Sequence, residues 1–311
     1  MNILKDLKIF APAANLTDII NQLEEGADEI YIGCIDDVWA QKYHRFNSAV
    51  ISPNRREGRS YNFSSWDDVE EAVHIVHDYG KSISFALNEH CYSKSALDDL
   101  KEIINRVVRI GFDYVIIEDP FLIDYFSFAD THIKVNLSGD TMVLNSYGVK
   151  WFQERGVSRI TFPQNITLPE IDVISRENPT MDFEVFILNG KCIFNSGTCF
   201  CMHGFQFIDG SMLPPLCANI ADKSDCHTKW FQKRIKGVTC GICAISFFKQ
   251  IPNITSLKIV GRDISPSDKL SLTKLIKIIL SSPDNMYLEI FCKTFGCDIL
   301  DCQNKLYCMY H

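Results

Sequence analysis

Short apolar runs alternate with amphipathic stretches along most of this 311-residue chain. Residues 8–13 form an apolar run, residues 16–23 carry apolar side chains at helical spacing, and residues 29–34 form the next apolar run. This alternation predicts strands separated by helices. The predicted strands are residues 8–13, 29–34, 82–88, 114–119, 133–138, 159–162, 183–188 and 256–261.

Most of the predicted strands are followed by a predicted helix. Ser64 and Ser65 before Trp66 are typical of a helix start, since a hydroxyl can cap free amides there. The charged stretch 54–60 is predicted as a loop. The other predicted helices are residues 16–23, 97–110, 146–155, 168–177 and 267–280, and the helix that begins at Trp66 buries apolar positions between 69 and 76.

Eight strands in regular alternation with helices favour an α/β fold of the (β/α)8 TIM-barrel type over an open doubly wound sheet. We expect one barrel domain over residues 1–263, with a cysteine-rich insert at 190–255 between the seventh and eighth strands. Residues 264–311 are expected to form a helix and a cysteine-containing tail packed on the barrel. In such a barrel, functional side chains lie at the carboxyl ends of the strands.

The composition restricts the compartment and the class of partner. No apolar run has the length of a signal peptide or of a membrane span, so we expect a cytoplasmic protein. Thirteen cysteines in a reducing compartment indicate metal or redox chemistry rather than disulfides. A formal net charge of −8 argues against a broad nucleic-acid-binding surface.

The insert holds seven of the thirteen cysteines. Thiolates are ligands for zinc and for iron–sulfur clusters. Only Cys240 and Cys243 form a Cys-x-x-Cys pair, whereas a zinc ribbon has two. The spacing leaves open an iron–sulfur cluster, a zinc site, or packing of several of these cysteines. The seven are Cys192, Cys199, Cys201, Cys217, Cys226, Cys240 and Cys243.

Four charged residues at predicted strand ends are candidates for chemistry. Glu118 and Asp119 could act as an acid–base pair, or could cap the following helix. Lys258 and Arg262 could hold an anionic substrate, such as a carboxylate or a phosphate. The alternative for these two cations is an internal salt bridge with Glu118 or Asp119.

Several segments, in order, resemble the collagenase-like proteins of peptidase family U32. Each segment alone is a weak signal, but the ordered set is specific. The segments lie at residues 11–13, 25–33, 85–88, 111–120, 136–138, 143–146 and 256–262.

The resemblance implies a 4Fe-4S cluster held by four cysteines. Cys192 and Cys199, separated by six residues, are similar to the first two ligands of the family motif. Cys217 matches the third, and Cys240 the fourth, with Cys243 as its rival. Six further cysteines fall outside the motif and would be packing residues, or the last four of them would hold a second metal: Cys201, Cys226, Cys292, Cys297, Cys302 and Cys308.

The family resemblance also implies a function. It predicts a hydroxylase or modification enzyme that uses the cluster and no molecular oxygen, like the family's ubiquinone-synthesis and RNA-base hydroxylation proteins. The acidic balance favours a small aromatic or peptide substrate over RNA, and no electron donor is identified.

Two alternatives remain. One is a cluster-bearing accessory subunit of a paired homologue, since Val260 replaces the family's usual acidic residue. The other is a peptidase, for which the chain has no recognisable catalytic motif.

Overall fold

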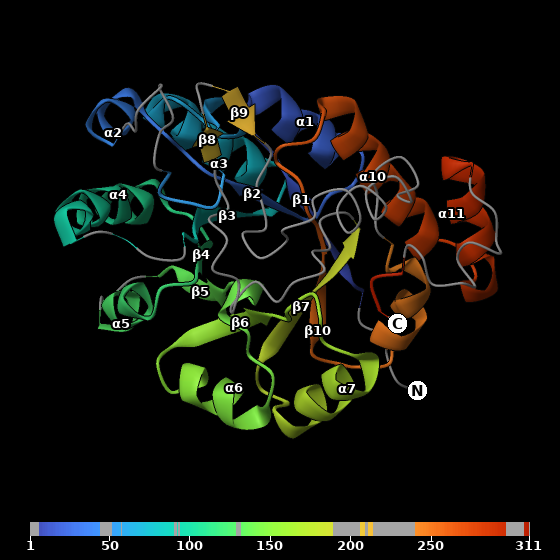
Figure 1. Cartoon of the computed structure of the whole chain (residues 1–311). Helices are drawn as coiled ribbons and strands as arrows, with labels where there is room; N and C mark the ends of the chain where they lie inside the picture. The colour runs from blue at the N-terminus through green and yellow to red at the C-terminus, as the bar shows by residue number, and fades with distance from the viewer. Residues whose placement is uncertain are drawn as a thin grey trace.

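The computed structural model describes residues 6–43, 52–56, 58–89, 92, 94–128, 132–188, 206–208, 211–213, 240–296 and 308–310. Within these ranges, eight parallel strands close into a barrel in the order β1-β10-β7-β6-β5-β4-β3-β2 (Figure 1). The barrel strands are β1 (Lys8–Pro12), β2 (Glu29–Ile32), β3 (Ser82–Leu87), β4 (Tyr114–Ile117), β5 (Lys134–Leu137), β6 (Val157–Thr161), β7 (Asp182–Leu188) and β10 (Ile254–Ile259).

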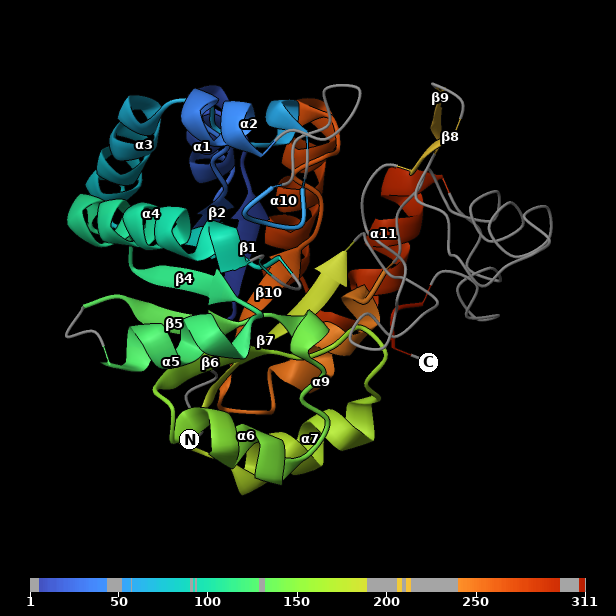
Figure 2. The same cartoon turned by 60° about the vertical axis from the view of Figure 1, so that its left-hand side comes forward.

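Helices surround the barrel, and Figure 2 shows them on the outside of the strands. Seven of them follow barrel strands: α1 (Leu16–Glu24), α3 (Trp66–Asp78), α4 (Leu97–Ile110), α5 (Pro120–Phe128), α6 (Ser146–Gln153), α7 (Leu168–Glu177) and α10 (Pro266–Leu280). The other helices and the short antiparallel hairpin are α2 (Asp37–Lys42), α9 (Ile245–Phe248), α11 (Tyr287–Phe295), β8 (Gln206–Ile208) and β9 (Ser211–Leu213).

The predicted eight-stranded parallel barrel is confirmed, and the predicted strands coincide with the observed ones to within a few residues. The predicted helix 97–110 has the bounds of α4. Helix α5 was not predicted, because its sequence, PFLIDYFSF, is apolar around most of its circumference and lacks a polar face. Most of the cysteine-rich insert, residues 189–205 and 214–239, lies outside the described residues.

Local capping fixes where the helices begin. The Ser65 hydroxyl accepts hydrogen bonds from the backbone amides of Asp67 and Asp68, as predicted for the start of α3. Thr167 and Glu170 form a reciprocal capping box at the start of α7. Because these caps satisfy amides that lack helical partners, the strand–helix connections can stay short.

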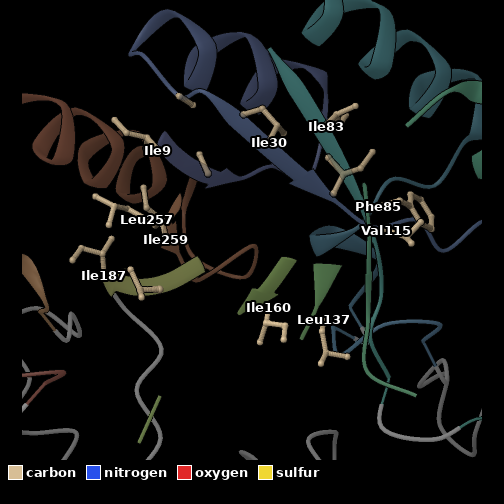
Figure 3. Packing of buried hydrophobic residues seen from close by; sticks show 14 of the residues in the cluster. Ile9, Ile30, Ile83, Phe85, Val115, Leu137, Ile160, Ile187, Leu257 and Ile259 are labelled. Atoms are coloured by element: carbon tan, nitrogen blue, oxygen red, sulfur yellow. The ribbon is translucent and has the colours of Figure 1, made fainter. Parts of the chain in front are cut away.

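Side chains alternate between the two faces of every barrel strand. Figure 3 shows ten labelled apolar side chains, among them Ile30, Ile83 and Leu257, which belong to the cluster between the strands and the helices. A second, small apolar cluster contains Phe10, Tyr31 and Ile116. These three residues occupy the alternate positions, which point into the barrel.

Helix α10 follows the last strand and lies beside α1. Lys269 of α10 donates to the carboxylate of Asp18 at 2.6 Å, and both side chains are buried. The boundary at residue 263 stays a prediction. Among the described helices, none combines the length and the apolar character that crossing a bilayer would require.

Candidate functional site

The interior of the barrel is polar and charged at its centre. Arg159 of β6 donates two hydrogen bonds to Glu29 of β2, at 2.6 and 2.9 Å, and both side chains are 2% exposed. The Ser256 hydroxyl donates to the same carboxylate at 2.7 Å. Burial raises the pKa of Glu29, but the charge and hydrogen bonds of Arg159 outweigh it and leave that pKa below its ordinary value.

Glu184 of β7 connects this interior pair to the carboxyl end of the barrel. Its fully buried carboxylate accepts hydrogen bonds from Lys258 and Thr161, both at 2.8 Å, and from Asn136 at 3.1 Å. Arg159 Nη1 lies 3.7 Å from the other side of the same carboxylate. Glu184 therefore fixes the position of the Lys258 side chain.

Lys258 lies in an aromatic and acidic environment. Its Nζ is 4.7 Å from the ring centre of Phe10 and 4.9 Å from that of Tyr31, distances at which a cation is attracted to a ring face. The alternative pairing of Lys258 with Glu118 or Asp119 was wrong, because its carboxylate partner is Glu184. The reason is the strand order: β7 and β10 are neighbours, and Glu184 pairs with Ser256, two residues before Lys258 on the same face of β10.

A cavity of about 160 Å³ opens at the carboxyl ends of the strands. Its wall joins the end of the barrel interior to the loops above it, as expected for a functional site in this fold. The polar residues of the wall are Arg55, Arg56, Asn88, Ser138, Asp140, Gln164, Lys258 and Arg262. The apolar part of the wall includes Tyr31, Ala86, Ile116, Phe186 and Val260.

Arg262 is a buried cation that is hydrogen-bonded to neutral amides. Its Nη1 donates to Asn62 Oδ1 at 2.8 Å, and its Nη2 donates to Asn54 Oδ1 at 2.5 Å. Burial lowers the pKa of Arg262 to about 10, although Tyr31 and Asp263 oppose that shift and Arg56 adds to it. The alternative pairing with Glu118 or Asp119 was wrong here too.

Gly33 makes room for this arrangement. A Cβ atom at position 33 would lie 2.0 Å from Arg262 Nη1 and 2.5 Å from Asn62 Oδ1. Only a residue without a side chain therefore allows the guanidinium to pass over the end of β2.

Two more arginines of the wall are paired with acids. Arg55 forms an ion pair with Asp140 and lies 3.6 Å from Glu118 Oε2. Arg56 Nε lies 3.1 Å from Asp263 Oδ1. The loop that carries both arginines was predicted as a loop only, and the adjacent pair Arg55-Arg56 was the signal that could have indicated a function.

Glu118 and Asp119, the predicted acid–base pair, make different contacts. The Asp119 carboxylate accepts the backbone N–H of Phe121 at 2.8 Å and so caps the start of α5. Glu118 is buried beside Arg55, a residue of the cavity wall. The structure thus brings Glu118, Lys258 and Arg262 to the cavity region and assigns Asp119 a capping contact.

Cys240 lies next to the end of β7. It forms a bridge with Leu188, the last residue of that strand, and its side chain is buried. Its sulfur accepts the backbone N–H of Ile242 at 3.4 Å, the type of hydrogen bond that stabilises a thiolate. Cys243 is exposed.

The other three predicted cluster ligands, Cys192, Cys199 and Cys217, lie outside the described residues. Among the residues that the structure does describe, no three His, Cys, Asp or Glu side chains are placed to hold a metal ion together. Cys308 pairs with Cys240 through a backbone β-bridge rather than a disulfide bond, whereas Cys292 of α11 is buried in the hydrophobic core.

Curated relatives were found in several bacteria. A tRNA hydroxylation protein P of Helicobacter pylori is 25% identical over 196 residues, which is 63% of this chain and 42% of that protein. The tRNA hydroxylation protein P of Escherichia coli is 25% identical over 62% of this chain and 38% of its own length. This chain thus spans about two fifths of the length of these relatives.

A solved structure of a U32 peptidase covers 59% of this chain, with 16% identity, a TM-score of 0.44 and 69% of its own length aligned. The sequence model of Peptidase family U32 matches residues 14–286, which is most of the chain. The protein belongs to Peptidase family U32.

Proposed function

We propose that this chain is an oxygen-independent hydroxylase of the U32 type, with a 4Fe-4S cluster beside the cavity at the barrel mouth. The ligands would be Cys192, Cys199, Cys217 and Cys240. The observation that carries the proposal is the position of Cys240 at the end of β7, the strand that also contributes Phe186 to the cavity wall.

The described part of the site fits such a cluster. Four thiolates are the donor set that a 4Fe-4S cluster takes, and hydrogen bonds to the ligand sulfurs tune it. Cys240 supplies one buried sulfur with one such hydrogen bond. Its exposed rival Cys243 lies three residues further, in the 3-10 turn Ile242–Ala244 before α9.

When bound, the cluster supplies one-electron chemistry, and the chain's own residues bind and orient the substrate. Lys258 and Arg262 would hold an anionic group of the substrate by charge-assisted hydrogen bonds. Glu184 keeps the Lys258 ammonium in place, and the two asparagines do the same for Arg262. Glu118 is the candidate to hold or accept a proton near the cavity, with Arg55 beside it.

We propose a small aromatic molecule or a peptide as the substrate. A cavity of about 160 Å³ has room for a group of the size of one small ring. An RNA base is the second candidate, since relatives over about 62% of the chain are named tRNA hydroxylation proteins. The nucleosides of total tRNA from a host that expresses the chain, analysed by mass spectrometry, distinguish the two. A new hydroxylated nucleoside that needs Cys240 supports RNA.

The accessory-subunit alternative predicts that the chain binds a cluster but turns over substrate only with a paired homologue. The peptidase alternative predicts peptide cleavage that survives replacement of the cysteines. Turnover by the isolated chain contradicts the first alternative, and loss of all activity in Cys192→Ser contradicts the second.

The matched pair Cys240→Ser and Cys243→Ser tests the ligand assignment. We expect anaerobically purified Cys240→Ser to lose most of its iron, because a serine oxygen is a poor ligand for this cluster. Cys243→Ser should keep its iron and its absorption spectrum. The reverse pattern would make Cys243 the ligand, and equal iron in both variants would contradict a cluster at this end of β7.

A further inference from the structure

The C-terminal residues Cys308–Tyr310 lie against the segment that carries Cys240. The backbone of Cys308 forms a parallel β-bridge with that of Cys240, and the Met309 amide donates to the Cys240 carbonyl oxygen at 2.7 Å. Met309 is 1% exposed. Two segments that are far apart in the sequence therefore form one short strand-like contact at the end of β7.

Tyr310 anchors this contact to the barrel. Its hydroxyl donates to the carbonyl oxygen of Phe186, in β7, at 2.6 Å. Its ring packs edge-to-face on Phe248 of α9, with ring centres 5.3 Å apart and planes at 79°. Tyr310 thus bridges the strand before the insert and the helix after it.

Gly241 lets the tyrosine approach the backbone next to Cys240. A Cβ atom at position 241 would lie 3.0 Å from Tyr310 Cε2 and 3.2 Å from the Ile187 carbonyl oxygen. The Gly241 amide donates to that same oxygen at 2.7 Å. The backbone of residues 240 and 241 is therefore held from one side by β7 and from the other by Tyr310 and Met309.

We infer that Cys308–Tyr310, here called the C-terminal clamp, is a positioning element for Cys240, with Tyr310 as its principal residue. The inference rests on the proposed function, in which Cys240 is a cluster ligand. A ligand must be held in one orientation to keep a cluster in place, and residues that orient ligands affect metal affinity as strongly as about 10- to 100-fold. From the sequence, Cys308 was predicted to be a packing residue or one ligand of a second metal.

The first test needs no cluster. The apo chain is alkylated with iodoacetamide, and modification is followed at individual cysteines by mass spectrometry. Exposed Cys243 and buried Cys34 serve as fast and slow references in the same molecule. In Tyr310→Ala we expect the alkylation rate of Cys240 to rise roughly tenfold through local opening, with both references unchanged.

Two further variants guard against simple misfolding. In Gly241→Ala the added Cβ displaces the Tyr310 ring from the backbone of residue 241. This variant should therefore raise the alkylation rate of Cys240 in the same way. Tyr287→Phe is the control. Tyr287, the first residue of α11, also has a hydrogen-bonded hydroxyl, but its partners are Lys249 and Asp284 rather than residues near Cys240. Tyr287→Phe should leave Cys240 alkylation at the wild-type rate.

The second test uses the anaerobically purified holoprotein. In Tyr310→Ala, the rate of iron loss to a chelator should rise by about tenfold and the electron paramagnetic resonance spectrum of the reduced cluster should change. Tyr287→Phe should change neither. Unchanged alkylation of Cys240 in both Tyr310→Ala and Gly241→Ala overturns the clamp, whatever the iron content. Wild-type protein without iron overturns the ligand role of Cys240, and with it the positioning function, even where alkylation rises.

Discussion

Arg159 and Glu29 join opposite walls of the barrel through two hydrogen bonds of 2.6 and 2.9 Å. Their strands, β6 and β2, lie four places apart in the ring of eight. A bidentate guanidinium–carboxylate pair has a fixed geometry as well as a high interaction strength. The pair therefore fixes the distance across the barrel below the cavity.

The first prediction concerns the cost of breaking this pair. Arg159→Met leaves Glu29 buried without its main partner, and we expect it to lower the free energy of unfolding by about 3–5 kcal/mol. Arg176→Met, which removes the exposed pair with Asp172 on α7, should cost at most about 0.5 kcal/mol. Urea denaturation measures both. Equal costs for the two variants would show that the interior pair does not hold the barrel together.

The second prediction concerns pH. The pKa of Glu29 is lowered in the folded chain, so its ionised form contributes stability above its ordinary pKa of 4.5. That contribution falls as the pH drops below about 4.5 toward the lower folded value. We expect the unfolding free energy of wild type to decrease in this window and that of Glu29→Gln to decrease less. Parallel curves for the two chains would contradict the shift.

The third prediction concerns Arg262 and anion binding. Arg262→Gln removes a desolvated charge but keeps a side chain able to hydrogen-bond, so the free energy of unfolding should change by no more than about 1 kcal/mol. Stabilisation of the chain by benzoate or inorganic phosphate, measured as a shift in Tm, should disappear. Lys101→Gln on the surface of α4 is the control and should keep the shift.

Gly33→Ala should also abolish stabilisation by anions. Its Cβ would displace the Arg262 guanidinium, whereas an added Cβ in Gly148→Ala meets its nearest neighbour, Val143, at 3.3 Å. Retained anion binding in Gly33→Ala and Arg262→Gln would exclude Arg262 from the binding site.

The fourth prediction separates Glu118 from Asp119. Asp119→Ala removes the cap of α5 and should cost about 1 kcal/mol of stability, with turnover preserved. Glu118→Gln should lower turnover by roughly 100-fold or more if this residue moves a proton. Denaturation and product formation are measured for both. Normal turnover in Glu118→Gln would exclude Glu118 from proton transfer.

The barrel could be predicted from sequence because each strand carries apolar side chains that face the helices. Ile9, Ile83 and Val115 are examples of this helix-facing set. The residues that point into the barrel were harder to predict from the sequence. Glu29 and Glu184 lie inside apolar runs and were taken as part of the strands, although a buried charge needs a partner that sequence cannot name. Partners such as Arg159 come from a distant strand, and only the closed ring places them together.

In the candidate site too, the strand residues could be predicted from the sequence and the loop residues could not. Lys258 and Arg262 were predicted because they lie on one face of the last strand, and both line the cavity. Arg55 and Asn54 were not predicted, because they lie in a loop between β2 and α3 that passes over the mouth. Loop conformation depends on contacts with residues as distant as Arg262, 208 positions away from Asn54.

The most direct test of the proposed function is metal analysis of the full-length chain purified without oxygen. The proposal predicts a brown protein with about four iron and four acid-labile sulfide per chain, and loss of both in Cys240→Ser. A colourless protein with one zinc per chain and no sulfide would contradict it.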